Sequence, residues 1–138
     1  MIMNRLPPFF SAYRTIRWVW IGYWLAAFTV THIPKPGDLN LPIQGGDKVL
    51  HAMIYFILTL MGGRVLMLRA KPIHPGTYAI WAVIYTIYGA LDEYLQGFVH
   101  RTPSIYDWLA DVLGILLATS LLVVYGAPAD TPDGEHET

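Results

Sequence analysis

The chain has 138 residues, of which 54% are hydrophobic and only 14% are charged, and its formal net charge is −1. A soluble domain usually carries about 25% charged residues, so this composition, together with a mean hydropathy of +0.41, favours a membrane protein. Cysteine is absent, which excludes disulfides and thiolate metal sites, and no basic patch interleaved with aromatic residues predicts a nucleic-acid partner.

Four apolar runs, separated by proline, glycine and charged residues, predict four helices. The first run follows Arg14 and Arg17, which is also typical of a signal peptide. No convincing small-residue cleavage site follows it, so we expect a retained helix. The predicted helices cover about residues 18–33, 47–68, 76–98 and 104–125.

At about 20 residues per crossing, these runs predict an all-α fold, a polytopic membrane protein with a bundle of four transmembrane helices. We expect one membrane domain over residues 1–126, with the lipid bilayer as its partner, and a disordered, acidic, cytoplasmic tail over residues 127–138. Only residues 99–103 connect the third and fourth helices, so these two should be antiparallel neighbours.

Basic residues predict the orientation of the chain, because short cytoplasmic loops carry an excess of lysine and arginine. Four crossings place both termini on one side. That side would hold six of the nine basic residues, so we expect both termini to be cytoplasmic. The six are Arg5, Arg14, Arg17, Arg64, Arg69 and Lys71.

Polar residues recur on three of the predicted helices, at the ends opposite the termini. A charged side chain at membrane depth costs about 2.5 to 3.5 kcal/mol on insertion scales, so such residues usually face a bundle interior or a wet cavity. Spacings of four residues place them in stripes on single helix faces. We therefore expect one polar cluster near the outer leaflet. Its members are Asp47, Lys48, His51 and Tyr55, then Asp92, Glu93 and Gln96, and then Arg101, Asp107 and Asp111.

Some of these residues also have structural interpretations. Asp47 could cap the second helix, and Lys48 could extend its aliphatic stem towards the headgroups. Ser104 and Asp107 could form a variant of the capping box that starts the fourth helix. Gly114 would permit a close helix approach.

Two segments, DKVLHAMIYF and DEYLQGFVHRTPSIYDWLADVLG, resemble the VanZ-like family of small membrane proteins. The family pattern is approximately D-K-x-x-H-x-x-x-Y, then D-E-x-x-Q-x-F, then a nearby R, then D-x-x-x-N-x-x-G. Asp111 departs from it, because the family often has asparagine there. The matching residues are Asp47, Lys48, His51, Tyr55, Asp92, Glu93, Gln96, Phe98, Arg101, Asp107 and Gly114.

The resemblance implies an integral protein of the bacterial cytoplasmic membrane. The founding member of the family is linked to glycopeptide (teicoplanin) resistance, so an envelope lipid or a glycopeptide-type ligand is an expected partner. The resemblance supplies no reaction, and the sequence contains no phosphate loop or H-E-x-x-H motif that would indicate one.

Two classes of function therefore remain open. In the first, the chain acts on or binds a lipid-linked or cell-envelope component, with His51, Asp92, Glu93 and Asp107 as candidate catalytic residues for acid–base chemistry. The candidate binding residues are Asp47, Lys48, Tyr55, Gln96, Arg101 and Asp111.

In the second class, the cluster has a structural role or handles ions or protons. The cofactor also stays open. A divalent cation bridged by Asp92, Glu93, Asp107 or Asp111 is compatible with the sequence, because oxygen-rich sites favour Mg, Mn or Ca.

Overall fold

The computed structural model describes residues 8–33, 46–68, 73–99 and 101–126. Within these ranges the chain is helical and contains no strand, so the predicted all-α fold is confirmed. The predicted disordered tail, residues 127–138, lies outside the described residues. The elements are α1 (Pro8–His32), α2 (Gly46–Met67), α3 (Pro75–Gln96), the short 3₁₀ helix η1 (Gly97–Val99) and α4 (Ile105–Gly126).

The second, third and fourth helices lie close to their predicted bounds, but the start of the first was wrong. Helix α1 begins at Pro8 instead of about residue 18. Proline is tolerated in the first helical turn, and the two arginines that suggested a boundary lie inside the helix. The Arg17 guanidinium carbon lies 5.8 Å from the ring centroid of Tyr13 and 5.5 Å from that of Trp18, within the range of cation–π contacts.

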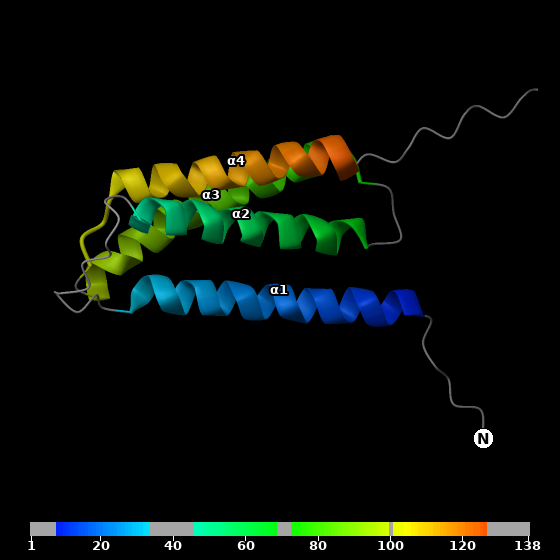
Figure 1. Ribbon diagram of the computed structural model, residues 1–138, viewed down its shortest axis with the longest axis horizontal. Coiled ribbons are helices and arrows are strands. Elements are labelled where there is room, and N and C mark those ends of the chain that lie inside the picture. The colour runs from blue at the N-terminus through cyan, green and yellow to red at the C-terminus, as the bar shows by residue number, and fades with distance from the viewer. Residues whose placement is uncertain (1–7, 34–45, 69–72, 100, 127–138) are drawn as a thin grey trace, which may run out of the picture.

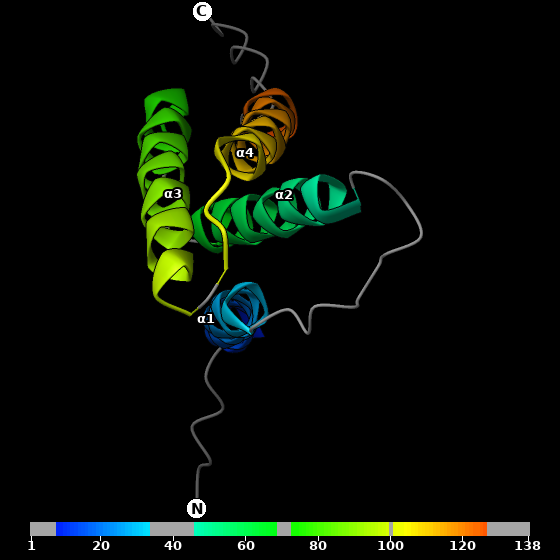
Figure 2. The same cartoon turned by 90° about the vertical axis from the view of Figure 1, so that its left-hand side faces the viewer.

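The four helices extend lengthwise along the bundle with alternating chain direction, as Figure 1 shows. Helices α2 and α4 begin at the end of the bundle where α1 and α3 finish, so α2 and α4 are parallel to each other. Helix α4 packs most extensively on α2 and also contacts α3, which confirms that the third and fourth helices are antiparallel neighbours. In the end-on view of Figure 2, α3 is steeply inclined and reaches from the level of α4 to that of α1.

The contact between α2 and α4 depends on a glycine. Gly114 is buried, and a Cβ atom added to it would collide with the backbone carbonyl oxygen of Ala52 and lie 3.0 Å from the backbone nitrogen of Phe56. Small residues allow helix backbones to approach closely in this way. The interpretation of Gly114 as a close-approach residue agrees with this geometry.

Helix α1 is attached to the other helices by an aromatic layer. Trp24 lies with its ring centroid 5.6 Å from Tyr85 and 5.0 Å from Tyr88, both on α3. The hydroxyl group of Tyr23 donates a hydrogen bond of 3.1 Å to the carbonyl oxygen of Ile54 on α2. These contacts hold α1 against both α2 and α3, so they also fix the position of its C-terminal end.

The outer surface of the bundle is unusually apolar. Large side chains such as Leu25, Ile87 and Leu117 are 65%, 64% and 53% exposed, whereas several carboxylates are buried. By length and composition, α2 and α4 could each cross a membrane, because each has 22 residues and includes an 18-residue stretch whose mean hydropathy is 1.7 in α2 and 2.0 in α4. At 1.5 Å per residue such a helix is about 33 Å long, close to the thickness of the hydrocarbon core.

Replacing Gly114 by alanine should separate α2 from α4 and destabilise the bundle by about 1 to 3 kcal/mol, the usual cost of overpacking. Thermal unfolding of the purified protein in detergent measures the effect. Gly22→Ala is the matched control, since a Cβ atom there meets no atom within 4 Å. It should be neutral or slightly stabilising, because alanine has the higher helix propensity. Equal melting temperatures for the two variants would contradict the close contact.

Candidate functional site

Three ionisable side chains from three helices meet inside the bundle, and we call them the triad: His51 of α2, Glu93 of α3 and Asp111 of α4. The Nδ1 atom of His51 lies 3.0 Å from Asp111 Oδ1 and 3.8 Å from Glu93 Oε1. All three are buried, with exposed fractions of 3%, 6% and 0%. They meet because α2 and α4 begin at the same end of the bundle, where α3 finishes.

Two carboxylate oxygens of the triad accept no hydrogen bond from the described residues. These are Oε1 of Glu93 and Oδ2 of Asp111, and the hydroxyl group of Tyr55 beside them is also unsatisfied. Unsatisfied buried acceptors cost about 1 to 3 kcal/mol each. The triad therefore contains hydrogen-bond acceptors that its neighbours among the described residues do not satisfy.

The second oxygen of Glu93 caps the N-terminal end of helix α4. Its Oε2 atom accepts a 2.9 Å hydrogen bond from the backbone N–H of Ser104, and the Ser104 hydroxyl oxygen accepts one of 3.4 Å from the N–H of Asp107. In a complete capping box the side chain of Asp107 would accept the Ser104 N–H. Here Glu93 replaces it, so the predicted capping box is present only in its serine half.

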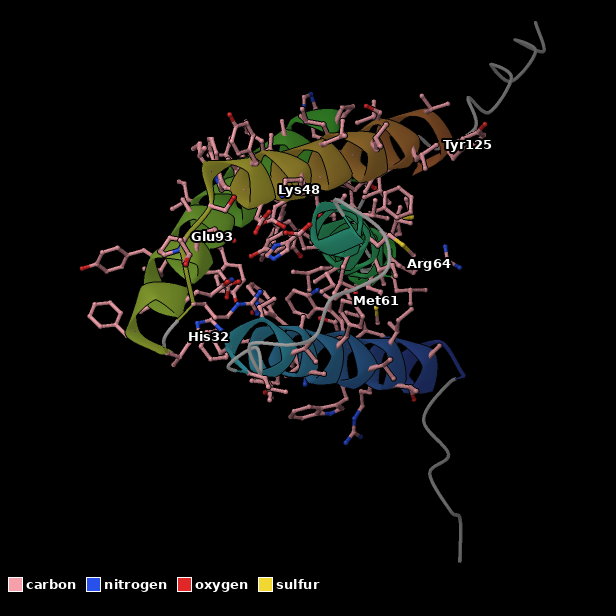
Figure 3. The ribbon with its side chains drawn as sticks, turned by 60° about the vertical axis from the view of Figure 1, so that its left-hand side comes forward. His32, Lys48, Met61, Arg64, Glu93 and Tyr125 are labelled. Carbon is pink, nitrogen blue, oxygen red and sulfur yellow. The ribbon has the colours of Figure 1, made fainter. Side chains whose placement is uncertain are left out.

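The carboxylate of Asp107 is thereby free to pair with Lys48, whose Nζ atom lies 3.2 Å from Asp107 Oδ1 and 3.3 Å from Asp47 Oδ2. The Lys48 side chain is 43% exposed. This ionic layer lies nearer the beginnings of α2 and α4 than the triad does. Figure 3 shows Lys48, Glu93 and His32 towards one end of the bundle, and Arg64 and Tyr125 towards the other.

Asp92 belongs to a second polar group between α3 and α1. Its Oδ2 atom accepts a 3.1 Å hydrogen bond from Gln96, while its Oδ1 atom lies 3.5 Å from Thr31 Oγ1 and 3.7 Å from His32 Nδ1. A cavity of about 10 Å³ beside Asp92 has room for about one water molecule. Arg101 donates a hydrogen bond to the backbone carbonyl oxygen of Thr31, which ties the connection before α4 to α1.

The structure thus brings the candidate residues close together, although in two groups. The triad and its ionic layer hold His51, Glu93, Asp111, Asp47, Lys48 and Asp107. The second group holds Asp92 and Gln96. Arg101 lies in the connection before α4 and bonds to Thr31 of α1, and Tyr55 lies between the two groups. Their catalytic or binding roles stay predictions. Sequence reasoning missed Thr31 and His32. The predicted topology offered a signal, since it placed the end of the first helix on the same side as the acids.

Comparisons with known proteins add no activity. No family model matches the chain, and no solved structure matches it. An uncharacterized protein of Schizosaccharomyces pombe is 33% identical over 87 residues, which are 62% of this chain and 51% of that protein. The chain therefore spans about half the length of this curated relative.

The contact between His51 and Asp111 should appear as a coupling in a double-mutant cycle. We expect His51→Ala and Asp111→Ala to couple by about 0.5 to 3 kcal/mol in unfolding free energy, as buried contacting pairs do. The measurement is unfolding of the purified protein in detergent. The control cycle pairs His51→Ala with Ser120→Ala. Ser120 lies on α4, as Asp111 does, but it is exposed and donates a hydrogen bond to the carbonyl oxygen of Leu116 in its own helix. Coupling of equal size in both cycles would exclude a specific contact.

Proposed function

We propose that the chain is an integral membrane protein of the VanZ-like family in which all four helices cross the bilayer. The distribution of side chains supports this, because the exposed surface is apolar and the buried carboxylates face the bundle interior. Such an inverted arrangement suits a lipid solvent. Helix α1 has 25 residues and α3 has 22, so both are long enough to span.

The proposed location is the bacterial cytoplasmic membrane, with both termini in the cytoplasm, as the resemblance and the basic residues indicate. The polar end of the bundle, with Lys48 and Glu93, then faces the outer leaflet. The relative described above is fungal, so the proposal on the host organism rests on the resemblance alone.

The proposed function is to bind or act on the polar head of a lipid-linked or cell-envelope component at this end of the bundle. The observation that carries the proposal is the triad, in which an imidazole and two carboxylates converge from three helices. Each carboxylate has one oxygen that accepts no hydrogen bond from the described residues. Such groups can exchange protons with a bound molecule. The exposed ammonium group of Lys48 lies close by, where it would attract a phosphate or carboxylate.

The alternative function is structural or concerns ions or protons, and the second polar group favours it. Asp92 is engaged with Gln96 and with the end of α1, as expected for groups that hold helices together. The two functions differ in what mutation removes: a working site loses activity in a folded protein, whereas a structural cluster loses the protein itself.

The orientation gives the first test. A green fluorescent reporter fused after Tyr125 should fluoresce in a bacterial host, and a phosphatase that needs the periplasm should be inactive at the same position. The reason is the excess of basic residues on the side of the termini. An active phosphatase would reverse the orientation.

The function gives the second test, profiling of lipids and envelope precursors in cells with and without the chain. We expect the chain to change the amount of at least one lipid-linked or envelope species, and Glu93→Gln and Arg101→Ala to abolish that change while membrane-inserted protein stays at the wild-type level. Arg64→Ala is the control for Arg101, since Arg64 is exposed at the opposite end of the bundle. If the inserted protein disappears in Glu93→Gln and Arg101→Ala, the cluster is structural.

A further inference from the structure

We propose that His51, Glu93 and Asp111 bind a divalent first-row transition cation. The ligand atoms would be Nδ1 of His51, Oε1 of Glu93 and a carboxylate oxygen of Asp111. The inference deepens the proposed function, since it assigns a cofactor to the same site, but the metal can be measured without any knowledge of the substrate.

The distances fit a metal centre with little movement. One ligand atom from each residue can be chosen so that all three lie within 4.8 Å of one another. Ligands at about 2.0 to 2.2 Å from a zinc ion in tetrahedral geometry are about 3.4 Å apart. The observed separations of 3.0 and 3.8 Å from His51 Nδ1 bracket that value.

The unsatisfied oxygens are the second observation that points to a cation. Oε1 of Glu93 and Oδ2 of Asp111 are buried and accept no hydrogen bond from the described residues. A metal ion in the triad would bind oxygens of these carboxylates directly. It would thus remove a cost that packing alone leaves in place.

The charge balance agrees with a divalent ion. Within the described residues, Lys48 is paired with Asp47 and Asp107, and Arg101 donates to a backbone carbonyl oxygen. The two carboxylates of the triad therefore face one imidazole. With that imidazole neutral, a charge of +2 would neutralise both carboxylates in a medium where uncompensated charge is costly.

The surroundings also orient the ligands. The Ser104 N–H holds Oε2 of Glu93, so the other oxygen of the same carboxylate faces His51. Outer-shell hydrogen bonds commonly fix metal-binding carboxylates in this way. The serine cap of α4 would then serve as part of the metal site.

The donor set selects the class of metal. One imidazole nitrogen and two carboxylates suit Zn²⁺, Mn²⁺ or Fe²⁺, whereas Ca²⁺ and Mg²⁺ prefer oxygen ligands alone. Three protein ligands leave a coordination position for water or for an oxygen of a bound headgroup. The competing arrangement is a protonated His51 that donates to Asp111 across the 3.0 Å contact, and it requires no metal.

Metal binding to the full chain, purified in detergent with an affinity tag that lacks histidine, tests the proposal. The protein is stripped with a chelator and equilibrated with Zn²⁺, Mn²⁺, Mg²⁺ or Ca²⁺ in turn, and bound metal is measured by inductively coupled plasma mass spectrometry. We expect about one Zn²⁺ or Mn²⁺ per chain, with weaker binding of Mg²⁺ and Ca²⁺. The same ion should raise the melting temperature, because it binds the folded state.

Two adjacent residues supply the matched variants. Glu93→Gln and Asp92→Asn each change a buried acid of α3 to its amide, but only Glu93 belongs to the triad. Affinity should fall at least tenfold in Glu93→Gln, as loss of a ligand predicts, and stay within about twofold of wild type in Asp92→Asn. Asp111→Asn should behave like Glu93→Gln, which covers the case in which one of them fails to fold.

Three results would overturn the proposal. They are no metal bound to the wild type, equal affinity in wild type and in Glu93→Gln, and equal losses in Glu93→Gln and Asp92→Asn. If metal binds as expected but the envelope profile does not depend on the chain, the proposed function fails and the metal site stands. If the envelope profile depends on Glu93 but no metal binds, the metal site fails and the proposed function stands.

Discussion

The parallel contact between α2 and α4 is the constraint on which the polar cluster depends. Gly114 has no Cβ atom, and a Cβ atom there would collide with the backbone of α2 at Ala52. Since the helices are parallel and begin at the same end of the bundle, positions near their starts lie at the same depth. His51 and Asp111 meet for this reason, although they are far apart in the sequence. Helix α3 then needs only to end beside them to add Glu93.

The bundle exposes many large apolar side chains and buries several charged ones, which is unusual for a water-soluble domain. Leu25 and Ile87 point outwards, whereas Asp111 is completely buried. In water this would forfeit hydrophobic burial and would also carry the cost of desolvating charges. In a bilayer the outer face is already solvated by lipid, so helix packing and the internal polar contacts can hold the bundle together.

Much of this arrangement could be predicted from helix periodicity. The spacing of Asp47, His51 and Tyr55 defined a stripe, and the short connection before α4 made α3 and α4 neighbours, so the approach of three polar faces followed. Individual partners could not be predicted, because they depend on helix rotation and tilt. Asp92 and Glu93 are consecutive on α3 and therefore point about 100° apart, so Glu93 joins the triad while Asp92 faces α1.

Other features were harder to derive. Asp111 departs from the resembled family pattern, yet it is completely buried and pairs with His51. The start of α1 was misplaced because Arg14 and Arg17 suggested a helix boundary, although long basic side chains can lie along a helix and extend to its surroundings. The capping of Ser104 involves an acid from another helix, and a capping rule read along one segment does not include such a partner.

The Glu93 side chain is long enough to make two contacts at once. One oxygen reaches the first turn of α4 and the other faces the imidazole of the neighbouring helix. An aspartate at this position is one methylene shorter, so it would reach one partner and lose the other. Position 93 therefore selects for reach as well as for charge: a family of such proteins should tolerate exchange of the two acids at position 92 more readily than at position 93.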